Sequence, residues 1–416
     1  MERLIFHVDV NSAFLSWEAT RRVMNGEPDI REIPSCISGD PDKRTSVVLA
    51  KSIPAKKYGI VTGEPLSAAL RKCPNLYVAK PDFRLYSRSS KAFKDICRHY
   101  APVVEEFSID ECFLDMTGTR LIYPDPIKTA YEIKDTIRDT LGFTVNVGIG
   151  PNKLLAKMAS DFEKPDKVHT LFREEIPSKM WCLPVSDLLM AGRSAVDKLN
   201  RANIRTIGDL AGTDLKKVQR LLGVKLGLML HNYANGINNS PVSDEREAAK
   251  GYSVSKTFNE NVTSIEEANK ILLTLADSVT SRMRRDNAKT SCVSVKIRSS
   301  SFKNRSHQLN LYEATDTTSE IYEVSKRLFR EVWDGYTPLR LIGISLTKID
   351  YGEAVQLSLF EDEKKERDRR IDKTVDSIRS RFGMDTVKRG ALLNTDMDVG
   401  KKYKAQMEEK GDSYDI

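Results

Sequence analysis

Apolar and polar positions along the chain predict two separate series of strands and helices. In the first series, a strand and a helix are followed by two short strands around a turn, and then by helix, strand and helix. The predicted ranges are strand 4–10, helix 12–24, strands 103–107 and 112–116, helix 126–141, strand 143–149 and helix 151–161. This order is a split β-α-β layout. It is interrupted after its first helix by an inserted subdomain, which has a strand-like run at 46–50 and a helix-like run at 65–73.

The second half of the chain repeats the mixed pattern after a helical region. Residues 168–240 are predicted to be wholly helical, and the polar stretch 238–250 is a candidate linker. Residues 251–350 then give a second β-α-β-β-α-β series, whose helices begin with capping boxes of the Ser/Thr-x-x-Glu type. We therefore expect an α+β, multidomain fold.

Beyond residue 351 the pattern changes to charges and then to a short amphipathic segment. Residues 361–370 are all charged, and we expect them to be flexible. The following apolar residues share one helical face: Ile371, Val375, Ile378 and Phe382. This segment is either a small helix that packs on the body of the protein or one that meets a partner.

The composition agrees with a cytoplasmic, reduced protein. A chain of 416 residues, 40% of them hydrophobic, is long enough for about two to four domains. No apolar run approaches the roughly 20 residues that span a bilayer, and the N-terminal apolar stretch is too short for a signal peptide. The six cysteines form no CxxC pair, which argues against a zinc site or a disulfide framework. The net charge of +7 is compatible with a nucleic-acid partner but is weak evidence alone.

Three carboxylates are candidates for a metal site. Asp9 follows directly on the first apolar strand, where an uncompensated charge is costly, and Asp110 and Glu111 lie at the tip of the predicted hairpin. In a split β-α-β sheet the first strand and the hairpin are neighbours, so the three side chains are expected at one sheet edge. Clustered carboxylates need a cation to stay ionised together, and two Mg²⁺ ions suit phosphoryl transfer. A solvated turn is the alternative explanation for Asp110 and Glu111.

The motifs around these carboxylates resemble those of the Y-family DNA polymerases, the group that includes DinB and UmuC. The matching segments are HVDVNSAF at 7–14 and FSIDECFLD at 107–115, and SIDE at 108–111 is the most specific part. The spacing between the two motifs also matches, and the resemblance extends from residue 1 to about residue 350.

This resemblance implies a translesion DNA polymerase of bacterial type, with palm, fingers, thumb and little-finger domains. It implies that Asp9, Asp110 and Glu111 are the catalytic metal ligands, with the backbone carbonyl of Val10 as a further ligand. The implied limits are 1–25 and 79–167 for the palm, 26–78 for the fingers, 168–237 for the thumb, 238–250 for a linker, 251–350 for the little finger and 351–416 for a C-terminal tail.

The resemblance also implies a set of nucleotide-binding residues. Phe14 matches the aromatic gate whose ring leaves no room for a ribose 2′-hydroxyl, although a core position on the first helix is the alternative. Lys164 matches the lysine that contacts the triphosphate. In the fingers segment SIPAKKYG, Ile53 stands where the family has tyrosine and Lys56 where it has arginine. Lysine neutralises phosphate without the bidentate geometry of arginine, so nucleotide handling is expected to depart from the family pattern.

Basic residues in two regions are candidates for DNA contact. They are Lys153 and Lys157 in the palm, and Lys296, Arg298, Lys303 and Arg305 in the little finger. The palm pair lies near the start of a predicted helix, where phosphate binds favourably. Because alternate residues of a strand share a face, Lys296 and Arg298 point the same way. An ordinary solvated face explains the little-finger residues equally well.

The peptide at 356–360 resembles the segment by which bacterial polymerases bind the sliding clamp. Its glutamine and apolar anchors are Gln356, Leu357, Leu359 and Phe360. Packing of these residues on the core is the alternative.

Together these features predict a low-fidelity, template-directed DNA polymerase that works as a monomer on primer-template DNA with deoxynucleotides. The altered fingers leave a second possibility, a DNA- and clamp-binding accessory protein or a restricted nucleotidyl transferase on the same fold. A nucleotide cyclase with a similar palm is disfavoured by the thumb-like helices and the clamp-like peptide.

Overall fold

The chain divides into two compact units, each of which combines β-sheet with helices. The computed structural model describes residues 3–245, 247–352, 363–383 and 386–392. The first unit comprises residues 1–39 and 47–246, and the second comprises residues 40–46 and 247–416. The peptide 356–360 lies outside the described residues. The domain limits within the two units remain predictions.

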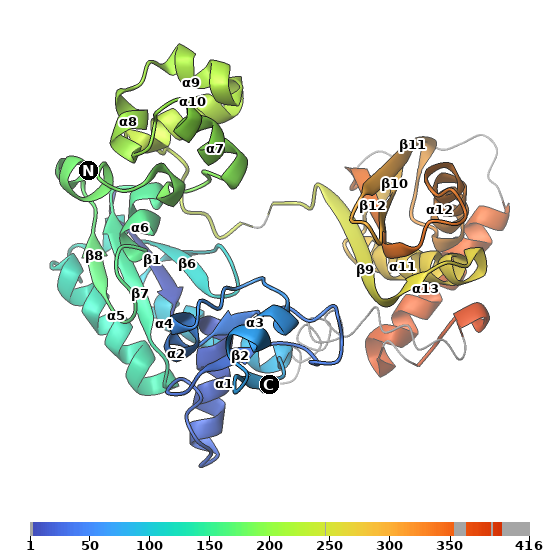
Figure 1. The fold of residues 1–416 in the computed structure, drawn as a ribbon, viewed down its shortest axis with the longest axis horizontal. Coiled ribbons are helices and arrows are strands. Elements are labelled where there is room, and N and C mark those ends of the chain that lie inside the picture. The colour runs from blue at the N-terminus through green and yellow to red at the C-terminus, as the bar shows by residue number, and fades with distance from the viewer. Residues whose placement is uncertain (1–2, 246, 353–362, 384–385, 393–416) are drawn as a thin grey trace. The chain divides into compact units, whose positions relative to one another are not determined.

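The central sheet of the first unit has the order β5-β6-β1-β7-β8 (Figure 1). Its strands are β1 (Ile5–Val10), β5 (Val103–Glu106), β6 (Glu111–Asp115), β7 (Val145–Gly150) and β8 (Val168–Thr170). The first strand lies in the middle, antiparallel to β6 and β7, which confirms its predicted place beside the hairpin. The prediction that 168–240 is wholly helical was wrong at its start. Residues 168–170 pair with β7, because a valine and a threonine in a short extended segment complete the sheet edge.

Four helices pack on or around this sheet: α1 (Ala13–Met24), α4 (Phe83–Tyr100), α5 (Pro126–Leu141) and α6 (Lys153–Ser160). Local signals set their ends. Asp125 caps α5 by accepting bonds from the amides of the first turn, and Gly142 ends it with φ +75°. The cap of α6 is Asn152, whose side chain accepts from the Leu155 amide.

Helix α6 lies unusually close to β7. A Cβ built on Gly148 would meet the Ala156 carbonyl oxygen at 2.0 Å and the Ser160 amide nitrogen at 2.4 Å. Only glycine therefore allows the helix to sit at this depth on the sheet.

The insert after α1 forms a small domain with its own core. Its elements are β2 (Ser35–Ile37), β3 (Ala50–Lys51), α2 (Ile53–Lys57), α3 (Leu66–Lys72) and β4 (Tyr77–Ala79). The strands are ordered β3-β2-β4, and the buried cluster includes Val48, Ile60 and Leu66. The helix predicted at 65–73 is confirmed as α3.

The remainder of the first unit is helical. It contains α7 (Arg193–Arg201), α8 (Ile207–Gly212), α9 (Leu215–Leu222) and α10 (Val224–Ala234). Short helical turns lie at η1 (Thr117–Thr119), η2 (Arg173–Glu175), η3 (Ile176–Met180) and η4 (Val185–Asp187), and η5 (Gly390–Leu392) belongs to the second unit. Helices α7, α8, α9 and α10 share a core with Leu154 and Leu155 of α6, so this helical region packs directly on the helix beside the central sheet.

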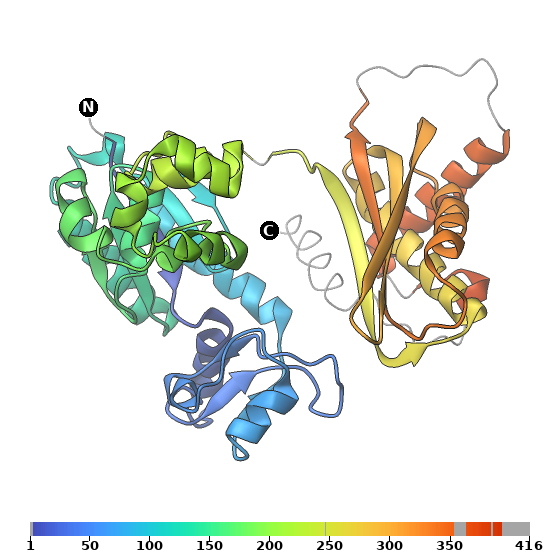
Figure 2. The same cartoon turned by 45° about the horizontal axis from the view of Figure 1, so that its top comes forward.

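The second unit is built on an antiparallel sheet of order β11-β10-β12-β9. Its elements are β9 (Gly251–Val262), α11 (Ile265–Arg285), β10 (Lys289–Ser299), β11 (Asn304–Thr315), α12 (Thr318–Val332) and β12 (Leu339–Asp350). This order confirms the predicted β-α-β-β-α-β series. Both helices cover the same face of the long strands (Figure 2), where Val295 and Ile297 of β10 are buried.

A further helix, α13 (Glu363–Phe382), packs on α11 and α12. The expectation of flexibility for the charge run was wrong for residues 363–370, which form the first turns of this helix. Its buried residues are Asp372 and Arg379, whereas Ile371 and Phe382 are 46% and 71% exposed. The helix therefore packs on the protein itself, which was one of the two predicted alternatives, but it does so through its polar face.

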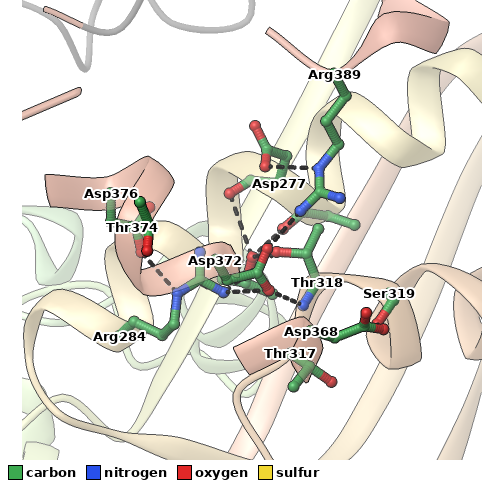
Figure 3. A network of polar contacts seen from close by, with 12 residues as sticks. Asp277, Arg284, Thr317, Thr318, Ser319, Asp368, Asp372, Thr374, Asp376 and Arg389 are labelled. Atoms are coloured by element: carbon green, nitrogen blue, oxygen red, sulfur yellow. Dashed lines mark hydrogen bonds and ion pairs between the residues drawn. The ribbon is translucent and has the colours of Figure 1, made fainter. Parts of the chain in front are cut away.

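Ion pairs hold α13 in place (Figure 3). Asp372 accepts from Arg284 of α11 at 3.2 Å, from Arg389 at 2.5 Å and from the Thr318 amide at 2.7 Å. That amide belongs to the first turn of α12, so a carboxylate from one helix caps the N-terminus of another. Among the described residues, no helix is both long and apolar enough to cross a membrane.

Candidate active site

Asp9 and Glu111 face each other across the middle of the first sheet. They are directly opposed in the antiparallel register of β1 and β6, which places their side chains on the same face. Their carboxylates and the His7 ring each offer a ligand atom, and these atoms lie within 4.8 Å of one another. The sequence predicted the convergence of the two carboxylates but gave no role to His7.

Asp110 lies in the turn just before β6. Its backbone carbonyl accepts from the Val10 amide at 2.9 Å, so the turn is fixed to the end of β1. The Asp110 carboxylate accepts from the Ser108 hydroxyl at 2.6 Å, and the Ser108 carbonyl accepts from Lys94 at 2.7 Å. These bonds fix the turn, but the ligand atoms that converge within 4.8 Å among the described residues belong to His7, Asp9 and Glu111 and not to Asp110. Its part in metal binding, like that of the Val10 carbonyl, stays a prediction.

Two lysines neutralise the facing carboxylates. Lys157 of α6 lies 2.6 Å from Glu111 Oε2 and 3.2 Å from Asp9 Oδ2, and Lys164 lies 2.7 Å from Asp9 Oδ1. Both lysines also contact Asp161, at 3.5 and 2.9 Å. The sequence placed Lys157 among the DNA contacts and Lys164 at the triphosphate, and the structure brings both to the carboxylates.

This charge arrangement favours the ionised form of Glu111. Burial alone would raise the pKa of Glu111, but His7 and then Lys157 outweigh it and hold that pKa at about 2. Burial opposes the charged form of Lys157, yet Asp9, Asp161 and Glu111 together raise its pKa. The pKa of Lys164 is also raised, because Asp9 and Asp161 outweigh its burial.

His7 is the residue of this site that sequence reasoning missed. It is fully buried, its Nε2 lies 3.0 Å from Glu111 Oε2, and its Nδ1 lies 2.8 Å from Ser160 Oγ. Its burial lowers its pKa in spite of the neighbouring carboxylates. A signal was present in the sequence, because alternate strand residues share a face and His7 is two residues before Asp9.

Ser160 links His7 to α6. Its Oγ lies 2.8 Å from both His7 Nδ1 and the Lys157 carbonyl oxygen, and its hydroxyl can donate to either of them. On the other side of the ring, His7 Nε2 lies 3.0 Å from Glu111 Oε2.

The residues present suit a divalent cation. Carboxylate oxygens are the ligands that hard cations prefer, and two converge here beside a buried ring nitrogen that lacks a hydrogen-bond partner. The Lys157 ammonium sits between the same oxygens, where it balances their charge.

Phe14 lies in a cluster of aromatic rings near the start of α1. Its ring stacks on Tyr86 at 4.6 Å between centroids with an interplanar angle of 11°, and it also contacts Trp17 and Phe83. Phe14 is half-buried, whereas Tyr86 and Trp17 are fully buried. One side of the Phe14 ring is therefore fixed by packing, and both predicted explanations, gate and core, remain compatible with its position.

The residues predicted in the fingers lie at the surface of the insert. Lys56 is exposed on α2, and Ile53 at the start of the same helix is 57% exposed. Burial, followed by the charge of Lys56, lowers the pKa of Lys51 on β3. The insert thus places two lysines near each other, and the sequence reasoning missed the second.

The predicted DNA contacts are more dispersed. Lys153 donates to the Glu105 carboxylate at 2.5 and 2.7 Å. In the second unit, Lys296 and Lys303 are exposed, Arg298 donates to Asn304 at 2.8 Å, and Arg305 lies 3.8 Å from Asp334. Lys296 and Arg298 lie on the sheet face opposite the two helices, as the alternation of strand residues predicts.

Three family models match this chain. The impB/mucB/samB family matches residues 8–161, its C-terminal domain matches residues 249–359, and the thumb domain of DNA polymerase-iota matches residues 187–238.

Curated proteins and solved structures are also similar. DNA polymerase IV of Clostridium acetobutylicum is 46% identical over 397 residues, which cover 94% of this chain and 99% of that protein. DNA polymerase IV 1 of Bacillus subtilis is 34% identical over 394 residues, covering 94% and 93%. A solved Y-family DNA polymerase chimera shares the fold, with a TM-score of 0.72 at 22% identity over 84% of this chain and all of that one.

Proposed function

The chain belongs to the impB/mucB/samB family of Y-family DNA polymerases, and we propose that it extends a DNA primer opposite a template at the site formed by Asp9, Asp110 and Glu111. Its α+β multidomain fold is that of the family, and it is a DNA-directed DNA polymerase of the translesion class. The observation that carries the choice of site is the direct opposition of Asp9 and Glu111 at the centre of the sheet.

The carboxylates hold the cations on which this family depends, and we expect two Mg²⁺ ions per site. When bound, these ions activate the primer 3′ oxygen and stabilise charge on the triphosphate. Lys157 and Lys164 lie against these carboxylates and balance their charge. The Val10 carbonyl is expected to add a further oxygen.

The two lysines have different parts in the proposed reaction. Lys157 is 13% exposed and contacts both carboxylates, so it stays beside the metal ligands and sets their charge balance. Lys164 is 35% exposed and contacts Asp9 alone among the three proposed ligands. Its ammonium is therefore the freer of the two to turn toward an incoming triphosphate, where it neutralises phosphate oxygen.

Phe14 selects the sugar of the nucleotide. A ring held from behind by Tyr86 cannot retreat from a 2′-hydroxyl, so deoxynucleotides are preferred. Lys56 neutralises the triphosphate as a point charge, and Ile53 offers it no hydrogen bond. Lys296, Arg298, Lys303 and Arg305, with Lys153 of the palm, bind the DNA backbone independently of sequence.

The remaining features concern the setting of the enzyme. We propose that it acts as a monomer in the cytoplasm and docks on a sliding clamp through 356–360. A clamp tether raises the effective concentration at the primer end without strengthening the grip on DNA.

Primer extension with Mg²⁺, on undamaged and lesion-bearing templates, tests this function. The wild-type protein should add deoxynucleotides to both, and Asp9→Asn, Asp110→Asn and Glu111→Gln should each lose incorporation while retaining primer-template binding. Incorporation by an Asp110→Asn variant at the wild-type rate would remove Asp110 from the site. DNA binding without incorporation by the wild-type protein would instead favour the accessory protein or restricted transferase.

A further inference from the structure

Helix α13 lies beyond the last residue matched by a family model. The C-terminal domain of the family matches residues 249–359, whereas α13 spans Glu363–Phe382. The proposed polymerase mechanism uses none of its residues.

The inner face of α13 is held rigidly by charge. Arg284 of α11 lies 2.6 Å from Asp376 and 3.2 Å from Asp372, and Arg379 lies 2.8 Å from Asp277 of α11. Arg284, Asp372 and Arg379 are all buried, so one orientation of the helix is strongly preferred. The face that α13 presents outward is therefore a fixed property of the second unit.

Several acidic residues of α13 are engaged in contacts within the domain, whereas several of its basic residues are not. Asp368 accepts from Ser319, Glu366 pairs with Arg369, and Asp372 and Asp376 are bound by Arg284, so these acids are engaged within the domain. The basic residues that are exposed and have no ion pair within the described ranges are Arg367, Arg370, Lys373 and Arg381.

Helical geometry gathers these four residues on the outward side. At about 100° per residue, Arg367, Arg370 and Arg381 fall within roughly 60° of one another. Thr374 lies between them and Ser377 beside them, and one exposed acidic residue, Glu363, shares this direction in the first turn. Lys373 borders the same stripe. From Arg367 to Arg381 the stripe is about 21 Å long, and duplex DNA carries a charge for each ~1.7 Å of its axis.

The outward side of α13 and the sheet face that no helix covers lie on opposite sides of the domain. The sheet carries α11 and α12 on one face, α13 packs on those two helices, and Lys296 and Arg298 lie on the other face. Helix and sheet layers are each separated by about 10 Å, so the two basic surfaces are on the order of 20 Å apart. A straight DNA segment on the sheet cannot contact α13 as well.

We propose that the outward face of α13, formed by Arg367, Arg370, Lys373 and Arg381, binds the phosphate backbone of a second DNA segment, distinct from the one held by the sheet. Arginine with serine and threonine is a usual composition for sequence-independent contact with phosphate. The substrate of the enzyme is long DNA, so a second segment is always present at high local concentration. This contact goes beyond primer extension and would keep the enzyme on DNA between encounters with a primer end.

The test compares two DNA lengths with the full-length protein. Fluorescence anisotropy is measured with a short primer-template and with the same primer-template carrying a long duplex extension, over a series of salt concentrations. The variant Arg367→Gln/Arg370→Gln/Arg381→Gln should bind the long DNA at least about tenfold more weakly at low salt, with a salt slope reduced by about 2 to 3. Binding of the short DNA and incorporation on it should stay within twofold of the wild type.

A matched control removes the same charge elsewhere. Arg88→Gln/Lys91→Gln/Lys128→Gln alters exposed residues of α4 and α5 in the first unit and should leave both affinities within twofold. Equal affinity of wild type and α13 variant for the long DNA would overturn the proposal, as would an equal loss on both DNAs. Protection of Lys373 from acylation in the wild-type protein, by the long DNA and not the short one, gives a readout that needs no variant. Failure of primer extension in the wild type would leave these binding outcomes unaffected.

Discussion

Removal of the Asp372 side chain should lower the stability of the second unit without a large change in side-chain volume. Its side chain is 4% exposed and joins three elements, since it contacts Arg284 of α11, the first amide of α12, and Arg389 after α13. Removal of one partner from a buried ion pair costs about 3–5 kcal/mol. Arg284 keeps Asp376 and Arg389 keeps Asp277, so the lower end of this range, about 3 kcal/mol, is expected for Asp372→Ala.

The size of the effect should depend on charge as well as on the hydrogen bond. Asp372→Asn keeps an acceptor for the Thr318 amide but loses the negative charge at the N-terminus of α12, and it should cost about half as much. Lys373→Ala is the matched control, because the neighbouring side chain is exposed on the same helix and makes no ion pair within the described ranges. It should cost less than about 0.5 kcal/mol.

Hydrogen exchange followed by mass spectrometry resolves the two units in the full-length chain. A loss of about 3 kcal/mol corresponds to a roughly hundredfold fall in protection of α13 and of the first turn of α12. Peptides from the central sheet of the first unit should keep their protection. Protection of α13 within threefold of the wild type in Asp372→Ala would refute the idea that buried charge anchors this helix.

Four further outcomes follow from the site. In metal-free protein, the depressed Glu111 pKa contributes stability that is present above the ordinary carboxyl pKa of about 4.3 and is lost as pH falls toward 2. Lys157→Met should reduce this acid-dependent loss of stability, as measured by the melting temperature between pH 6 and 2.5. An unchanged profile would show that Lys157 does not set the Glu111 pKa. Phe14→Ala should raise ribonucleotide incorporation at least tenfold relative to deoxynucleotide incorporation in single-nucleotide extension, and an unchanged ratio would remove Phe14 from sugar selection. Chelation of divalent cations should abolish incorporation but leave primer-template affinity within about threefold, whereas persistent extension would contradict metal-dependent catalysis here. Gly148→Ala should lower both the melting temperature, by several degrees, and the rate of nucleotide incorporation, because the added Cβ would lie 2.0 Å from a backbone oxygen. A variant as stable as the wild type would show that α6 can shift freely.

The sequence predicted those helices and strands whose ends and burial depend on residues close together in the chain. Asp125 and Gly142 bound a helix because cap and left-handed residue act within one turn, and the apolar run at β1 identified a central strand. The strand β8 escaped prediction because it has three residues and is stabilised only by its neighbour β7.

Long-range pairing explains what the sequence did not reveal. Asp372 and Arg284 are 88 residues apart, and nothing in the charge run shows that its polar face is the packed one. The apolar pattern favoured the face of Ile371 and Phe382, which lies about a quarter turn from Asp372 and Arg379, and both apolar side chains prove to be exposed. His7 was missed for a related reason, because its contact with Glu111 depends on the register of two strands separated by about a hundred residues.

The absent side chain at Gly148 has a consequence for how this active site can evolve. Lys157 and Ser160, which meet the carboxylates and His7, both lie on the helix that rests on this glycine. The distance from the side chains of Lys157 and Ser160 to the carboxylates depends on the distance between the backbones of α6 and β7. These two backbones are so close that no Cβ fits between them at position 148. Substitutions around the site can therefore change which side chains meet there, but any residue larger than glycine at position 148 would move the lysine and the serine away from the carboxylates together.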